Sequence, residues 1–128
     1  AVRKPWQVAK LQAELGKERV LVGLVPALDT EAAAGFAKGA NDALGPVTSF
    51  VGAAGRFAPR QPGREPGQDL AELVEANLLA NATLVRALLP GMRRRSRGCL
   101  AFVGAGPTGL AAGSAAFAAA KEALHGYV

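Results

Sequence analysis

The sequence predicts an α/β fold with a parallel sheet. Four segments have the apolar spacing of helices, and three short apolar runs between them have the length of buried strands. Helices that alternate with strands are typical of a sheet whose parallel strands are joined by helical crossovers. The chain has 128 residues, half of them hydrophobic, so we expect one small domain with its own core over residues 1–128.

The first half of the chain has two helices and one strand with clear end signals. A helix is predicted from Pro5, which suits a first helical turn, to Gly16, which ends it. The continuous apolar run 19–25 predicts a strand. Asp29 can cap the next helix, which is expected to end at Gly45.

The second half continues the alternation of strands and helices. We predict a strand at 47–51 and then, at 56–68, an irregular loop rich in Pro, Gly and Arg. A long helix follows at 69–95, a third strand at 99–103 and a last helix at 114–128. Asp69 and Glu72 have the spacing of a capping box, which places the start of the long helix at Asp69.

Two asparagines interrupt the apolar stripe of the long helix. Asn77 and Asn81 lie on the same face as Leu70, Leu73, Val74, Leu84, Val85 and Leu88. A buried amide needs hydrogen-bond partners, so each asparagine is either a structural tie or part of a site. The position alone favours a structural tie.

The composition excludes several classes of protein. No apolar run approaches the roughly 20 residues that a membrane-spanning helix needs, so no membrane partner is expected. The single Cys99 lies in a strand pattern and provides no disulfide framework, which favours a reducing, cytoplasmic location. No metal site is expected.

The formal net charge is +5, and the basic residues are densest at Arg93–Arg97. Clustered arginines attract phosphate and would suit nucleic acid. They also suit a solvated helix end, where cations offset the helix dipole. No aromatic stacking platform neighbours the cluster. We therefore favour the helix end and do not expect nucleic acid as a partner.

Four segments together resemble the short-chain dehydrogenase/reductase family. They are GPVTSFVGAAG (45–55), ANLLANATLVRALLPGM (76–92), GCLAFVGAG (98–106) and FAAAKEALHGYV (117–128). Asn77, Gly104, Phe117 and Lys121 fall at the spacings of the family's Asn, Ser, Tyr and Lys. The resemblance implies a Rossmann-like doubly wound parallel sheet and NAD(P)-dependent oxidoreduction of a small carbonyl or alcohol.

The same resemblance indicates a divergent member with a degenerate active site. In the family the tyrosine transfers a proton to the substrate oxygen, and the lysine lowers the tyrosine pKa and holds the nicotinamide ribose. The serine positions the substrate, and the asparagine anchors a relay water. Lys121 and Asn77 are retained, but Phe117 has no hydroxyl and Gly104 has no side chain. The loss of a general acid should impair the usual reaction.

No neighbouring group replaces the missing phenol convincingly. Tyr127 lies ten residues further along the helix, roughly 15 Å away. Thr108 and Ser114 carry hydroxyls that are not acidic enough to imitate an activated phenol. His125 follows Lys121 by one turn and is interpreted as a surface residue at the helix end.

The resemblance gives mixed signals for the cofactor. Arg3 and Lys4 match the end of the family's second strand, where a basic pair indicates NADP(H), although an ordinary helix-start charge explains them equally well. The family's adenine-binding Asp is Pro26 here, and its Asn-Asn-Ala-Gly segment is Gly52–Gly55. NADP or NAD is expected, and the cofactor-binding residues implied are Arg3, Ala53, Ala54, Gly55 and Lys121.

The segment CLAFVGAGPTGLAAG (99–113) also contains a dinucleotide fingerprint, Gly104-x-Gly106-x-x-Gly109. A true fingerprint is followed by a helix and an acidic residue at the end of the next strand, whereas the nearest acid here, Glu122, lies in the predicted helix. VGAGPTGL resembles the opening motif of FAD-dependent monooxygenases. That alternative leaves the upstream matches unexplained, so we interpret the motif as a coincidence of spelling.

The resemblance places the family's first strand and glycine-rich loop before Ala1 and its late strands after Val128. We therefore expect the sequence to be an incomplete record of a longer protein, and this segment alone should not bind a dinucleotide tightly. Family members commonly assemble through the helices that match 69–95 and 115–128, so a homo-oligomer is expected.

Three hypotheses follow for the function. The first is a family member that binds NAD(P) but has lost its usual proton transfer. The second is an active oxidoreductase with an unorthodox proton donor. The third is a basic, non-enzymatic interaction module that uses Arg93–Arg97.

Overall fold

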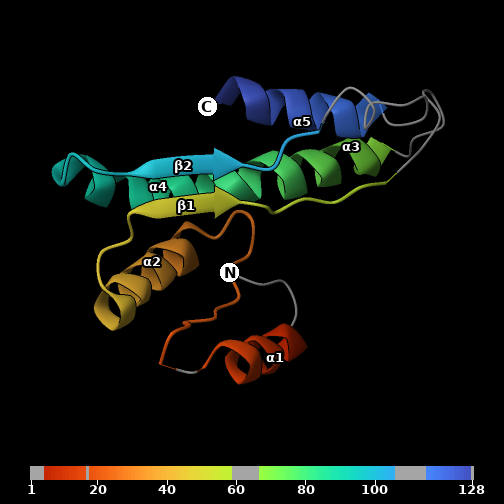
Figure 1. The fold of residues 1–128 in the computed structure, drawn as a ribbon. Coiled ribbons are helices and arrows are strands. Elements are labelled where there is room, and N and C mark those ends of the chain that lie inside the picture. Colours follow the sequence, from red (N-terminus) through yellow and green to blue (C-terminus); the bar gives the residue numbers. More distant parts are fainter. Residues whose placement is uncertain (1–4, 17, 59–66, 106–114, 128) are drawn as a thin grey trace. The chain divides into compact units, whose positions relative to one another are not determined.

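The computed structural model describes residues 5–16, 18–58, 67–105 and 115–127, and these residues form an α/β fold, as predicted. The elements in chain order are α1 Pro5–Leu15, α2 Thr30–Leu44, β1 Ser49–Gly52, α3 Gly67–Val74, the π-helical turn η1 Glu75–Leu79, α4 Ala80–Arg94, β2 Cys99–Phe102 and α5 Ala115–Tyr127 (Figure 1). None of the helices in these ranges is long and apolar enough to cross a membrane.

The sheet consists of β1 and β2, which lie side by side and point the same way (Figure 1). The Cys99 amide donates to the Thr48 carbonyl at 2.9 Å, and the Val103 amide donates to the Gly52 carbonyl at 3.0 Å. The same sequence separation joins both pairs, so the strands are parallel and in register. The helical segment α3–η1–α4 connects them, which confirms the predicted crossover between parallel strands.

The strand predicted at 19–25 is not formed. In the described residues the sheet has two strands, and only Leu24 in this run makes a bridge. An apolar run favours an extended backbone, but a strand also needs a neighbour that completes its ladder of hydrogen bonds. The prediction was wrong because the run finds no such ladder, and Leu24 remains 46% exposed.

The ends of α2 are as predicted. The Asp29 carboxylate accepts a hydrogen bond from the Ala32 amide at 2.8 Å, with extended backbone at Asp29. Gly45 ends the helix at φ 84°, and its amide donates to the Asn41 carbonyl. Both signals are local, because a carboxylate satisfies first-turn amides and glycine tolerates positive φ.

The predicted capping box of the long helix is wrong. The helix begins at Gly67, so Asp69 lies inside the first turn rather than before it. The Glu72 carboxylate forms an ion pair with the Arg56 guanidinium. A charged partner from the loop after β1 thus takes up the side chain that the spacing assigned to the cap.

The chain divides into two compact units, one over 1–50 and 83–100 and the other over 51–82 and 101–128. In the first, the Thr83 hydroxyl donates to the Ala27 carbonyl at 2.6 Å. In the second, α3 and η1 pack against α5, as Figure 1 shows for α3. The buried core of this second unit is formed by Leu73, Ala116 and Ala120.

Candidate functional site

The candidate site lies within the second unit, and its helical wall is the π turn η1. The Ala80 amide donates to the Glu75 carbonyl, which makes this turn one residue wider than an α-helical turn. Asn77 stands in the turn and Asn81 follows it, with exposed fractions of 0% and 1%. The prediction that both amides lie on the buried face is confirmed, so every polar atom of these side chains needs a partner within the protein.

Asn77 holds the loop that follows β1. Its side-chain oxygen accepts from the Arg56 amide at 3.3 Å, and its side-chain nitrogen donates to the Arg56 and Leu73 carbonyls, each at 2.9 Å. The amide thus pairs with both backbone groups of Arg56 while also satisfying a carbonyl of its own helix. This arrangement fixes the loop against η1.

Asn81 repeats this contact one turn later. Its side-chain nitrogen donates to the Ala54 carbonyl at 3.1 Å and to the Asn77 carbonyl at 2.8 Å. Both donors of the amide are therefore used, one on the loop and one on the helix. The two asparagines are structural ties, as their position predicted, and they tie the loop that the resemblance assigns to the cofactor.

Lys121 approaches the same loop from α5. The side chain is buried, with the residue only 8% exposed, and its Nζ donates to the Val103 carbonyl at 2.8 Å. Burial lowers the pKa of Lys121 below its ordinary value of 10.5, because desolvation disfavours the charged ammonium. Within the described residues the ammonium has one carbonyl partner, which leaves two further N–H donors for a ligand.

Gly55 lies where Asn77 and Lys121 converge. A Cβ atom at position 55 would lie 2.8 Å from the side-chain oxygen of Asn77 and 3.4 Å from the Lys121 Nζ. Both polar atoms therefore face the glycine Cα. The absence of a side chain at Gly55 allows the backbone of the loop to approach both groups closely.

Positions 117 and 104, which the resemblance assigns to the family's Tyr and Ser, differ in their surroundings. The half-buried ring of Phe117 meets the ring of Phe57 edge to face, with centroids 4.9 Å apart and planes at 83°. The Lys121 Nζ lies 5.8 Å from the Phe117 centroid. Gly104 is exposed, and no heavy atom of the described residues lies within 4 Å of the position that its Cβ would occupy. Neither residue offers a group that can transfer a proton.

The structure brings together most of the predicted site. Asn77, Gly55, Lys121 and Phe117 converge in the second unit, and Ala54 joins them through its carbonyl, whereas Ala53 is exposed. Several predicted or considered residues lie outside the described ranges, namely Arg3, Lys4, Gly106, Thr108, Gly109 and Ser114.

Three further residues considered from the sequence are exposed. Pro26 is exposed in the first unit. His125 is exposed on α5, as interpreted from the sequence, with its Nδ1 3.7 Å from the Glu122 carboxylate. Tyr127 is 43% exposed at the end of the same helix.

Sequence reasoning missed the aromatic and charged residues that the loop contributes. Phe57 packs on Phe117, and Arg56 pairs with Glu72 sixteen residues away. The loop has no apolar periodicity, so spacing could not place either side chain. The one usable signal was composition, because a large aromatic residue next to a glycine-rich turn is costly to leave wholly in water.

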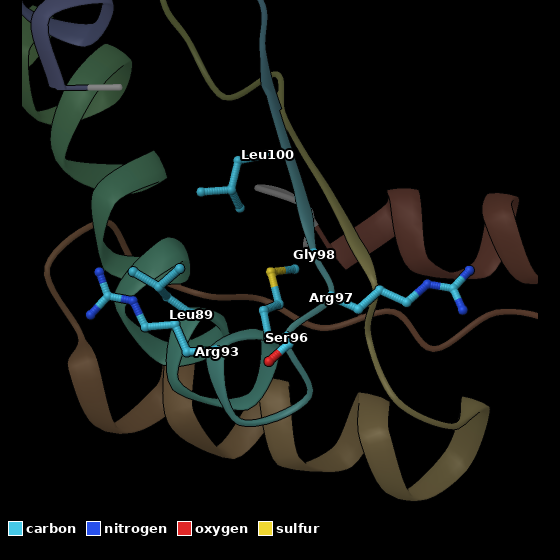
Figure 2. A pocket seen from close by; sticks show the side chains of 7 residues that line it. Leu89, Arg93, Ser96, Arg97, Gly98 and Leu100 are labelled. Atoms are coloured by element: carbon cyan, nitrogen blue, oxygen red, sulfur yellow. The ribbon is translucent and has the colours of Figure 1, made fainter.

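The basic cluster lies at the end of α4, in the first unit. Arg93 and Arg94 occupy the last turn, Ser96 adopts φ 49°, and the Arg95 guanidinium donates to the Val47 carbonyl at 2.7 Å. An open pocket beside this end is lined by Leu89, Met92, Arg93, Ser96, Arg97, Gly98 and Leu100. Figure 2 shows the guanidinium groups of Arg93 and Arg97 directed to opposite sides of it. The cluster therefore lies at the end of a helix, as predicted, where cations can offset the helix dipole.

Two solved structures described as short-chain dehydrogenases or reductases share the fold of this chain. A short-chain dehydrogenase from Streptomyces avermitilis is 28% identical to the chain with a TM-score of 0.85. An oxidoreductase of the short-chain dehydrogenase/reductase family from Burkholderia thailandensis is also 28% identical, with a TM-score of 0.82. Each comparison covers 98% of this chain and 47% of the other. No protein-family model and no curated protein matches the sequence.

A third structure shares the fold at lower identity. It is the NADPH-bound form of a short chain oxidoreductase from Pseudomonas aeruginosa PAO1, described as containing an atypical catalytic center. It is 18% identical with a TM-score of 0.84, and the match covers 98% of this chain and 51% of that one. The chain thus spans about half the length of the structures it matches. Their common fold and the two matches at 28% identity support membership of this chain in the short-chain dehydrogenase/reductase family.

Proposed function

We propose that the chain belongs to an NAD(P)-binding protein in which the usual proton transfer between protein and substrate is impaired. One observation carries the proposal. Lys121 and Asn77 are buried and held against Gly55, while the neighbouring position 117 presents a phenyl ring packed on Phe57. The arrangement keeps groups suited to a nucleotide and lacks the hydroxyl that the family resemblance places at position 117.

The residues present fit a nicotinamide nucleotide in part. Among the described residues the Lys121 ammonium has one acceptor, the Val103 carbonyl, so two N–H groups can reach ribose hydroxyls. Gly55 allows the close backbone approach that such a ligand needs. The adenine side is weaker, because Pro26 provides no carboxylate and Gly52 and Ala53 provide no side-chain amides. A bound nicotinamide would supply or accept the hydride.

The protein's own part in carbonyl reduction is the delivery of a proton. A carbonyl that gains a hydride develops negative charge on oxygen, which a positioned donor must neutralise. Phe117 cannot donate, and Gly104 cannot orient the oxygen. A general acid contributes about 10² to 10⁴ in rate, so turnover should be lower by that order.

Two measurements on the full-length protein test this proposal. Calorimetric titration with NADPH, NADH and, as a control, FAD should show binding of a nicotinamide nucleotide. Oxidation of NADPH by a panel of small aldehydes and ketones should be slow, and should rise about 10² to 10⁴-fold when Phe117→Tyr and Gly104→Ser are combined.

The matched control is Phe57→Tyr, which adds a phenol to the other ring of the same aromatic pair. It should leave turnover unchanged. The proposal is wrong if neither nicotinamide nucleotide binds, or if the unmodified protein already reduces carbonyls as fast as the combined variant. Binding of FAD alone would revive the glycine motif at 104–109 as a flavin site.

A second candidate function is an active oxidoreductase in which Lys121 is the proton donor. The observation that favours it is the position of the buried Lys121 ammonium beside Phe117. Desolvation lowers the pKa of Lys121 below 10.5, which suits a proton donor better. In that case the unmodified protein would turn over, its rate would fall as pH rises through the lysine pKa, and Lys121→Met would abolish turnover. Under the first proposal, turnover of the unmodified protein stays slow at every pH and does not follow a lysine pKa.

Two finer proposals follow from the resemblance. NADP(H) is preferred if Arg3 meets the 2′-phosphate, so Arg3→Ala should weaken NADPH binding and spare NADH binding. Assembly through helices 69–95 and 115–128 would give a homo-oligomer, which sedimentation of the full-length protein can test. Equal effects on both nucleotides, or a monomer, would contradict these proposals.

A further inference from the structure

Gly52 ends β1 in a space that admits no side chain. A Cβ at this position would lie 2.8 Å from the side-chain oxygen of Asn81 and 2.7 Å from the Phe102 ring. The backbone itself does not require glycine, because the described glycines with positive φ are Gly16 and Gly45. Asn81 and Phe102 therefore occupy the space that a side chain at position 52 would need.

The Asn81 amide is positioned to act on the loop Gly52–Arg56. The residue is 1% exposed, and its two N–H groups reach the Ala54 and Asn77 carbonyls. The first contact fixes the middle of the loop. The second contact braces Asn77, whose own amide binds Arg56 and faces Gly55. Asn81 thus acts on the candidate site through two neighbours.

The family resemblance places an asparagine at position 52, where this chain has glycine. The Asn81 amide, which belongs to α4 and not to the strand, lies in the volume next to Gly52. We propose that Asn81 is the positioning residue for the loop Gly52–Arg56, taking the place of an amide at position 52. Its effect on nucleotide affinity rests on the proposed function, whereas its effect on the loop does not.

A double-mutant cycle of Asn81→Ala and Gly52→Asn tests whether one amide replaces the other. Asn81→Ala removes the tie to Ala54 and vacates the space. Gly52→Asn introduces an amide that collides with the Asn81 oxygen, but not in the Asn81→Ala background. The Phe102 ring approaches position 52 in both backgrounds, so its contribution cancels when the two costs of Gly52→Asn are compared.

Thr83→Ala is the matched control for Asn81→Ala. Thr83 is a buried polar residue on the same helix, two residues further on, and its hydrogen bond goes to Ala27 in the first unit. Removing it should cost stability without touching the loop. Comparison of the two variants therefore separates loop positioning from a general loss of helix stability.

The experiment uses the full-length protein, with amide hydrogen exchange of residues 52–56 and the Kd for NADPH as readouts. Asn81→Ala should speed exchange in the loop and weaken NADPH binding by about tenfold, whereas Thr83→Ala should do neither. Gly52→Asn should be less destabilising in the Asn81→Ala background than alone.

Equal rates of amide hydrogen exchange at residues 52–56 in Asn81→Ala and Thr83→Ala would overturn the assignment. An equal loss of stability from Gly52→Asn with and without Asn81→Ala would overturn it as well. If Gly52→Asn does not fold alone, folding of the double variant supports the exchange of amides, and failure of both refutes it. If the unmodified protein does not bind NADPH, the proposed function fails, but exchange and stability still decide the role of Asn81.

Discussion

Substitution of Gly55 by alanine tests the geometry of the candidate site most directly. The added Cβ would lie 2.8 Å from the side-chain oxygen of Asn77 and 3.4 Å from the Lys121 Nζ. Ordinary van der Waals contact begins at about 3.4 Å, so Asn77 must move while Lys121 need not. Asn77 is anchored by hydrogen bonds to Arg56 and Leu73, so it cannot retreat without weakening them.

The expected cost is about 2 kcal/mol. Overpacking a tight site costs about 1–3 kcal/mol. The alternative, in which Asn77 gives up one or two hydrogen bonds at about 1 kcal/mol each, leads to the same range. Urea unfolding followed by circular dichroism should therefore show a lower midpoint with an unchanged slope.

Gly35→Ala is the matched control, because no heavy atom lies within 4 Å of the Cβ position at Gly35 in α2. Alanine in a helix interior should stabilise by about 0.5–1 kcal/mol relative to glycine. Both substitutions replace glycine by alanine, but their effects on the free energy of unfolding should have opposite signs. A Gly55→Ala protein within about 0.5 kcal/mol of the unmodified protein would show that the close approach of Asn77 to Gly55 is not real.

Three further substitutions test the caps, the buried hydroxyl and the buried ammonium. Asp29→Ala should cost about 1 kcal/mol through loss of the cap at the Ala32 amide, and an unchanged urea midpoint would contradict it. Thr83→Val should cost about 1–2 kcal/mol, since it keeps the side-chain volume and removes the hydrogen bond to Ala27; no loss by the same assay would refute the bond. The pKa of Lys121 in the folded protein lies below 10.5, the value expected in the unfolded chain. At a pH between these two pKa values the unfolded chain binds more protons than the folded protein, so the free energy of unfolding should rise with pH. Lys121→Met should flatten that rise in urea unfolding across alkaline pH, and an unchanged slope would exclude burial as its cause.

The sequence predicted those parts of the fold that local chemistry determines. Asp29 and Gly45 end α2 as expected, because a cap carboxylate and a positive-φ glycine act within a few residues. The apolar stripe correctly placed Asn77 and Asn81 on a buried face. The resemblance named both Lys121 and Gly55 as cofactor-binding residues, and the structure places the Lys121 Nζ 3.4 Å from the Cβ position of Gly55.

The errors concern features that depend on a partner elsewhere in the chain. The run 19–25 has the composition of a strand but forms no ladder. Glu72 has the spacing of a capping residue, yet the Arg56 guanidinium competes for it more strongly than a neutral amide would. The π turn at Glu75–Leu79 could not be predicted, because Leu73, Asn77 and Asn81 keep the four-residue spacing that an ordinary α-helix also has.

Three of the departures from the pattern that the resemblance implies differ in how the rest of the structure responds to them. At Gly52 the vacated space is filled by Asn81, and at Phe117 the ring packs on Phe57, so reversal disturbs a formed contact. At Gly104 no heavy atom from the described part of the chain lies within 4 Å of a new Cβ. Gly104→Ser alone should therefore leave the urea midpoint unchanged, while Gly52→Asn alone should lower it. If both reversals cost the same, the space beside Gly52 is not specifically occupied by Asn81, and the two changes are equally neutral drift in a site that no longer constrains them.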